Sequence, residues 1–284
     1  MFKFRIISFP LLLLIFFLML FWQPAGWWIF AVVSTGAVML LTREFVQIVE
    51  KLGFPVMRRT AIGAVGAIIA AYHFERVFPA AAMIMFLIMA LPLFMMIPLI
   101  YCQDKAALLR SLFPTIGTVY LLLLIYFPLI IAFPMIKPFP QRPYHFLFLV
   151  LVTKAMDTGG YVFGLLSNRF LPGGNHKIMP KVSPKKSWEG FFGGIFASVL
   201  VAFIIFFCCD CFSVNLHWWK ILTMAVVLAI GSFFGDLTES ALKRSVDIKD
   251  SGNYIPGMGG VFDVLDSFIY NGWIWAFLLP VMMK

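Results

Sequence analysis

Charged side chains are scarce in this sequence. Of its 284 residues only 12% are Asp, Glu, Lys or Arg, whereas 62% are hydrophobic and 33 are phenylalanine. A soluble domain of this length needs a polar shell, and so few charges cannot supply one. Long apolar runs recur along the chain, which is typical of a membrane protein with several spans.

Cysteine is rare as well, and it gives little support for a structural metal site. The four cysteines are Cys102, Cys208, Cys209 and Cys211. The last three lie near His217, so a zinc site can be imagined, but the ligand pairs that a four-ligand structural site requires are missing. We therefore interpret these cysteines as small apolar packing residues.

The apolar runs predict an all-α polytopic membrane protein with about nine transmembrane helices, each needing roughly 20 residues. The first could pass for a signal peptide, but no small-x-small cleavage site follows, so we expect it to remain as one helix of a hairpin. The segment 43–59 is expected to lie along the membrane interface. The predicted spans are 7–22, 27–42, 60–73, 79–101, 114–133, 145–166, 190–209, 217–238 and 262–282.

The distribution of Lys and Arg predicts the orientation of these spans. With the N-terminus in the cytoplasm and the C-terminus outside, sixteen of the 22 Lys and Arg fall in inner segments, five in outer segments and Lys154 within a span. This bias favours that topology and places both long polar loops, 167–189 and 239–261, on the cytoplasmic side. The net charge of +9 then reflects loops beside anionic headgroups. No nucleic-acid partner is expected, because no basic-aromatic module is visible.

Intramembrane charge separates the chain into two halves. Spans one to five carry none, which indicates a scaffold or dimer surface over residues 1–144. Residues 145–284, with spans six to nine and both cytoplasmic loops, are expected to form the catalytic half. The compact chain without a transit peptide suits an integral protein of the bacterial cytoplasmic (inner) membrane, with its active site on the cytoplasmic side.

Two ionisable residues stand inside the sixth predicted span. Lys154 and Asp157 are three apart and therefore share one helical face. Ionisable groups within a membrane indicate either function or a mutually neutralising pair. Both interpretations stay open: an ion pair that locates the helix, or an Asp157 that faces a polar cavity, with Gly159 and Gly160 allowing close approach.

The loop 167–189 carries a dense basic patch. A basic loop at the inner surface usually only determines topology. The run from Ser183 to Ser187, with Lys185 and Lys186 inside it, is more specific, because either serine can cap the next helix and helix N-termini attract anions. Hydroxyl and ammonium groups at a helix start predict a phosphate site beside the lipid headgroups.

Three carboxylates flank the second loop. Asp236 ends span eight, on a helix face shared with Glu239 and Lys243, and Asp263 and Asp266 open span nine. Helix-dipole compensation explains the last two acids but not the first. Antiparallel packing would bring all three together, and converging carboxylates require a compensating cation. Oxygen ligands without Cys or His favour Mg²⁺, so Asp236, Asp263 and Asp266 are predicted metal ligands.

The segment between these acids is rich in cations and glycine. Lys243, Arg244 and Lys249 are predicted to bind phosphates, with Asp250 beside them. The turn Pro256–Gly260 contains three glycines, which free the backbone for a sharp return into the membrane and for amide contacts to phosphate.

These residues occur in the order and spacing of a known family. The stretch 240–267 (SALKRSVDIKDSGNYIPGMGGVFDVLDS) resembles the signature of the phosphatidate cytidylyltransferases, or CDP-diacylglycerol synthases. DTGGYVFG at 157–164 and SPKKSWEGFFGG at 183–194 resemble two further motifs of that family, and GDLTESALKR at 235–244 is similar to its helix end. The resemblance covers about residues 150–270.

The resemblance implies transfer of CMP from CTP to phosphatidic acid, giving CDP-diacylglycerol and pyrophosphate in phospholipid biosynthesis. It implies catalytic roles for Lys243, Asp263 and Asp266, and one or two Mg²⁺ ions on the three predicted metal ligands. A homodimer through the apolar first half is expected on the same ground. The residues expected to bind CTP or the lipid are Asp157, Ser183, Lys185, Lys186, Arg244, Lys249 and Asp250.

Two positions depart from the family pattern. Met258 stands where the family usually has His, and Val264 stands where it usually has Arg. The metal carboxylates are kept, so we expect an active enzyme in which nucleotide preference or rate differs.

Two other functions fit parts of the sequence. A CTP-dependent polyprenol or phytol kinase would phosphorylate an alcohol and release CDP instead of pyrophosphate. A non-enzymatic cation or lipid transporter would line its pathway with Lys154, Asp157 and Asp236. The uncharged first five spans and the lack of an inverted repeat argue against the transporter.

Overall fold

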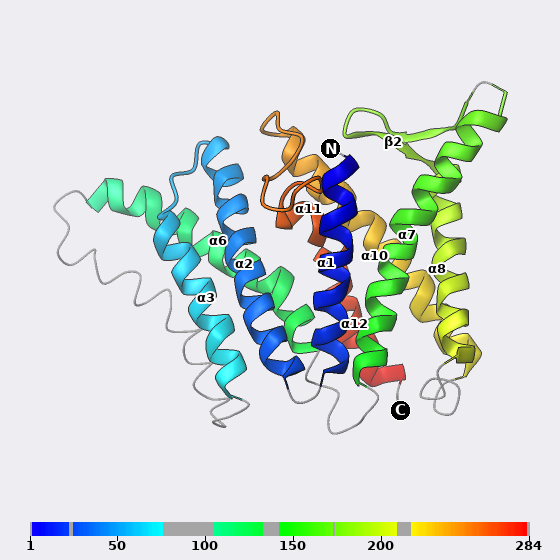
Figure 1. Ribbon diagram of the computed structural model, residues 1–284. Coiled ribbons are helices and arrows are strands. Elements are labelled where there is room, and N and C mark those ends of the chain that lie inside the picture. The colour runs from blue at the N-terminus through cyan, green and yellow to red at the C-terminus, as the bar shows by residue number, and fades with distance from the viewer. Residues whose placement is uncertain are drawn as a thin grey trace. The chain divides into compact units, whose positions relative to one another are not determined.

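The computed structural model describes residues 2–22, 25–75, 105–132, 142–172, 174–208 and 217–282. Within these ranges the chain is mostly helical, with one short strand pair (Figure 1). The elements are α1 (Phe2–Phe21), α2 (Gly26–Lys51), α3 (Arg58–Glu75), α6 (Lys105–Ala132), α7 (Arg142–Phe170), β1 (Lys177–Met179), β2 (Ser183–Ser187), α8 (Trp188–Cys208), α10 (Trp218–Arg244), α11 (Val261–Leu265) and α12 (Phe268–Met282).

Four helices within the described ranges are long and apolar enough to cross a membrane. They belong to α2, α7, α8 and α10 and correspond to predicted spans two, six, seven and eight. Shorter apolar stretches occur in α1, α6 and α12. The predicted span 79–101 lies outside the described residues. The candidate spans are Trp28–Lys51, Tyr144–Phe170, Trp188–Cys208 and Trp218–Arg244.

The contacts of the chain divide it into two units. The first comprises residues 1–124 and 245–264, and the second comprises residues 125–244 and 265–284. The segment 245–264, which follows α10, packs with the N-terminal helices. Residues that share one predicted loop therefore belong to different units.

Two of the predicted spans differ in extent from the helices of the structure. α2 does not end near residue 42 but continues to Lys51, because its apolar face persists through Val46 and Ile48, which are fully buried. The last predicted span is not one helix, since α11 ends at Leu265 and α12 begins at Phe268. Between them the Asp266 carboxylate accepts hydrogen bonds from both the N–H and the hydroxyl of Ser267, which compete with the helical pattern.

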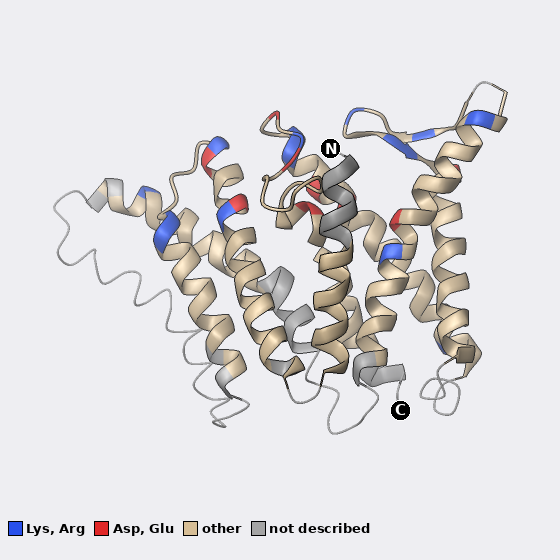
Figure 2. Cartoon of the chain, in the orientation of Figure 1, with Lys and Arg blue, Asp and Glu red and all other residues tan. Residues whose placement is uncertain are grey.

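The loop after α7 contains a hairpin that the all-α prediction omitted. β1 and β2 pair antiparallel, with Lys177 opposite Ser187 and Met179 opposite Ser183. Ser187, and not Ser183, caps α8, since its Oγ accepts the Gly190 N–H at 3.1 Å. Figure 2 shows Lys and Arg positions along this hairpin and at the adjoining end of α7. The strands are too short and too polar to give a periodic signal.

Glycines allow α7 and α8 to pack closely in the second unit. A Cβ at Gly194 would lie 2.8 Å from the backbone oxygen of Met156, and one at Gly193 would overlap the ring of Phe163. A Cβ at Gly190 would lie 2.7 Å from the backbone oxygen of Gly160. Small residues at such positions let helix backbones approach one another in a membrane. This contact fixes α8, and with it the β2 strand that precedes it.

Replacing Gly194 by Ala should destabilise the protein. The new methyl group would meet a backbone oxygen that cannot move without shifting α7, and overpacking of this kind costs about 1–3 kcal/mol. Gly36→Ala in α2 is the matched control, because a Cβ there meets nothing within 4 Å. Thermal unfolding of the purified protein in detergent measures both. Equal midpoints for the two variants would contradict the close packing.

Candidate active site

A polar network joins α7, α10 and the start of α12. The Lys154 ammonium group donates to Asp157 Oδ2 at 3.0 Å and to Ser267 Oγ at 3.1 Å. The Ser267 hydroxyl lies 2.8 Å from both Asp157 Oδ2 and Asp266 Oδ1, and Ser232 of α10 donates to Asp157 Oδ1 at 3.2 Å. These bonds satisfy charged groups in the middle of an apolar helix, where lipid could not. Lys154 and Asp157 therefore form the predicted ion pair, and it is part of a larger network.

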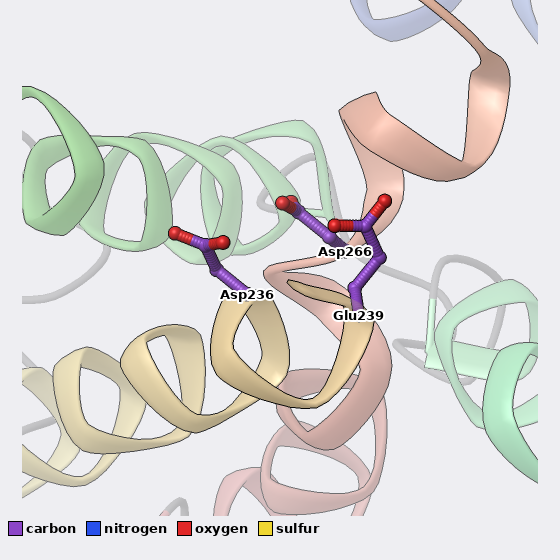
Figure 3. A group of neighbouring side chains, drawn as sticks. All are labelled: Asp236, Glu239 and Asp266. Atoms are coloured by element: carbon purple, nitrogen blue, oxygen red, sulfur yellow. The ribbon is translucent and has the colours of Figure 1, made fainter. Parts of the chain in front are cut away.

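Three carboxylates meet beside this network. Asp236, Glu239 and Asp266 each offer one oxygen, and these oxygens lie within 4.8 Å of one another (Figure 3). The first two share a face of α10, and the third follows α11. Gly235 permits the approach, because a Cβ there would overlap the backbone oxygen of Asp266 and lie 3.2 Å from the Cα of Ser267.

Each carboxylate of this acidic cluster has a lysine partner, and the three lysines come from three different elements. Lys186 of β2 lies 3.0 Å from Asp236, Lys243 of α10 lies 2.8 Å from Glu239, and Lys154 of α7 lies 3.9 Å from Asp266. Converging carboxylates disfavour one another's ionised form, and nearby cations offset that repulsion.

The acidic cluster has the donor set of a site for a hard divalent cation. Its ligands are carboxylate oxygens without Cys or His, which suits Mg²⁺ or Mn²⁺. The facing ammonium groups suit phosphate. The arrangement can therefore bring a metal ion and a phosphorylated ligand to one place.

A cleft of about 270 Å³ adjoins the acidic cluster in the second unit. It brings together five of the predicted substrate or metal ligands, and it also has apolar walls. Lys186 spans the two kinds of surface, since its Nζ donates to the Phe233 backbone oxygen at 3.2 Å and lies 4.6 Å from the centroid of that ring. The polar lining residues are Asp157, Ser183, Lys185, Lys186, Ser187 and Asp236, and the apolar ones include Met156, Tyr161, Phe191 and Phe233.

The third predicted metal ligand, Asp263, lies in the first unit. Its Oδ2 accepts hydrogen bonds from the Gly260 N–H at 2.7 Å and from the N–H and hydroxyl of Ser251 at 3.0 Å. These bonds tie the two ends of the segment 251–263 together. The assignment of Asp263 to a metal site remains a prediction.

The other predicted site residues lie near the boundary between α10 and the segment that follows. Lys243 and Arg244 end α10, whereas Lys249 and Asp250 are exposed in the first unit. Asp250 lines a separate cleft of about 220 Å³ together with Gln47.

The sequence placed Glu239 on the helix face of Asp236 without assigning it to the metal site, and it gave no signal for Glu44. Glu239 is part of the acidic cluster, and its spacing of three from Asp236 was a usable signal. Glu44 of α2 is completely buried and bonds to Ser251, 207 positions away. No local pattern could have connected those two residues.

Long apolar helices with a cluster of acids and lysines define an integral membrane protein with a candidate metal site. The chain belongs to the Cytidylyltransferase family, whose sequence model matches residues 3–282. It is similar to proteins named phosphatidate cytidylyltransferase from Staphylococcus haemolyticus, at 40% identity over 127 residues, and from Staphylococcus aureus strain COL, at 37% over 127 residues. Each match covers 45% of this chain and 45% of the relative, less than half of the curated protein's length.

Gly235→Ala should weaken divalent-cation binding about 10-fold, in the range found when the residues that support metal ligands are changed. The added methyl group would push Asp266 away from Asp236. Gly117→Ala in α6 is the control, because a Cβ there meets nothing within 4 Å. Electron paramagnetic resonance of Mn²⁺ titrated into the detergent-solubilised protein measures the affinity. Unchanged affinity in the Gly235 variant would contradict the joint use of these two acids.

Proposed function

We propose that this protein is a phosphatidate cytidylyltransferase, which transfers the CMP group of CTP to phosphatidic acid. Family membership and the names of the similar proteins support the reaction class. The observation that carries the proposal is the acidic cluster with its three lysines, beside a cleft with apolar walls. Such a site suits a reaction that joins two polyanions, one of which is a lipid.

The chemistry requires little from a general base. An oxygen of the phosphatidic acid phosphate forms a bond to the α-phosphorus of CTP, and the bond from that phosphorus to the β-phosphate oxygen breaks. Pyrophosphate leaves with the electron pair. Because the attacking phosphate is already anionic, the barrier lies in repulsion between the reactants, and catalysis depends on positioning and charge neutralisation.

The cationic residues would bind the phosphates. Lys243, Arg244 and Lys249 would contact the triphosphate. Lys186 would leave its ion pair with Asp236 and bind a substrate phosphate. Lys185, in the same strand, would bind the lipid headgroup or CTP. Ser183 of β2 would donate a hydrogen bond in that cleft, while Asp157 would keep Lys154 and Ser267 in place.

The acids would hold the metal. Asp236 and Asp266, joined by Glu239, have the oxygen donors that Mg²⁺ prefers. Asp263 is proposed as a further ligand, in keeping with the sequence signature. When bound, one or two Mg²⁺ ions would neutralise the triphosphate and stabilise the leaving pyrophosphate.

The proposal includes the membrane arrangement. Nine spans, a cytoplasmic N-terminus and an external C-terminus would place the site at the inner face of a bacterial cytoplasmic membrane, within reach of CTP. Residues 1–144 would serve as a scaffold for the catalytic residues 145–284 and as the surface of a homodimer. The four candidate spans and the bacterial source of the similar proteins support this arrangement.

Position-specific labelling of CTP tests the reaction directly. With phosphatidic acid as acceptor, label from the α-phosphate should enter the lipid and label from the γ-phosphate should leave as pyrophosphate. A polyprenol or phytol kinase would instead move the γ-label to an isoprenoid alcohol and release CDP. A transporter would incorporate neither label.

Asp236→Asn and Asp266→Asn should each lower turnover at least ~100-fold, the scale of losing one electrostatic stabiliser of the transition state. Each change keeps the side-chain volume and removes an anionic ligand. Asp247→Asn is the control, since Asp247 is exposed and its φ of 55° is one that Asn adopts readily. Steady-state rates at saturating Mg²⁺ compare the three variants. A rate near that of the wild-type enzyme for Asp266→Asn would refute the metal assignment.

A further inference from the structure

A buried carboxylate from α2 binds the segment that contains Asp263. Glu44 is 0% exposed. Its Oε1 accepts the Val261 N–H at 2.9 Å, and its Oε2 accepts the Phe262 N–H at 2.8 Å. Oε2 also lies 3.1 Å from the Ser251 hydroxyl, whose single hydrogen is shared between Glu44 and Asp263. The first N–H groups of a helix lack helical partners, and a buried carboxylate needs donors around it. The Glu44 carboxylate and the first two N–H groups of α11 therefore satisfy each other's hydrogen-bonding needs.

Two glycines of the segment make room for this carboxylate. A Cβ at Gly252 would lie 2.5 Å from Glu44 Oε1, and a Cβ at Gly260 would lie 2.5 Å from Oε2. Both glycines belong to the stretch that resembles the family signature. Their positions are thus explained by clearance around Glu44, in addition to any contact with a substrate.

The neighbours of Glu44 contact the same segment. The Arg43 guanidinium lies 5.6 Å from the ring centroid of Tyr254, and the ring of Phe45 packs edge-on against Phe262 with centroids 5.9 Å apart. Three consecutive residues of α2 therefore contact the segment 251–263.

We infer that Glu44 is a positioning residue for the signature segment 251–263. Glu44 and Asp263 both bond to Ser251, and Glu44 also fixes the two amides that directly precede Asp263. These bonds fix the direction of the Asp263 carboxylate, whose Oδ1 also lies 3.3 Å from the Ser251 N–H nitrogen. The catalytic consequence rests on the proposed function, whereas the ordering of the segment does not.

Glu44→Gln and Glu44→Ala test the inference against Glu50→Gln, an acid of the same helix that pairs with Arg58. Hydrogen exchange of the detergent-solubilised protein should quicken about 10-fold or more for amides of residues 251–263 in both Glu44 variants. Exchange in α10 should not change. The Gln variant retains one acceptor oxygen, so its effect should be the smaller of the two.

Magnesium dependence supplies the second measurement. If Glu44 orients Asp263, the Mg²⁺ concentration for half-maximal CTP turnover should rise about 10-fold in Glu44→Gln, as for other residues that support metal ligands. Glu50→Gln should keep the wild-type value. A loss of folded protein alone would lower the rate and leave this midpoint where it was.

Three results would overturn the inference: wild-type exchange in residues 251–263, an equal rise of exchange across the whole chain, or an unchanged Mg²⁺ midpoint. If neither Glu44 variant folds, Ser251→Ala removes the shared hydroxyl and should give a smaller rise of exchange in the same segment. The absence of that rise would equally count against Glu44. A wild-type protein that makes no CDP-diacylglycerol would refute the proposed function, and exchange would still decide the ordering role.

Discussion

Repulsion between like charges is the constraint on which this structure depends. Asp236, Glu239 and Asp266 place carboxylate oxygens within 4.8 Å of one another at the ends of apolar helices. Positive charge beside such an arrangement favours the ionised form of its carboxylates. Lysines from α7, β2 and α10 supply that charge in the structure described.

Close backbone packing makes this charge arrangement attainable. Gly235 lets α10 approach the backbone at Asp266. The glycines between α7 and α8 let these helices pack closely, and β2, which directly precedes α8, then places Lys186 3.0 Å from Asp236. The candidate site therefore depends on the helix packing, because any residue larger than glycine at these positions would separate the acids from their lysines. Asn271 reinforces the packing by donating to Thr153 Oγ1 at 2.8 Å and to the Leu228 backbone oxygen at 3.0 Å.

Features that depend on hydrophobic periodicity and composition, such as the long helices and several charged site residues, could be predicted from the sequence. Long apolar runs located α7, α8 and α10. The helical spacing of charges singled out Asp157 and Asp236, and the basic run between Ser183 and Ser187 singled out Lys186. What the sequence could not provide depended on contacts between distant segments or on competing local bonds. The partners of Glu44 are more than 200 positions away, and Ser267 interrupts the last span through hydrogen bonds that no hydropathy pattern reports.

The Ser267 hydroxyl has a single hydrogen but stands equally close to two carboxylates, on Asp157 and Asp266. It can satisfy only one of them at any instant. A cation that occupied Asp266 would claim the lone pairs facing the hydroxyl, and the hydrogen would then turn to Asp157. Cation binding to the acidic cluster would in this way change the hydrogen bonding of Asp157 in α7, the helix that lines the neighbouring cleft.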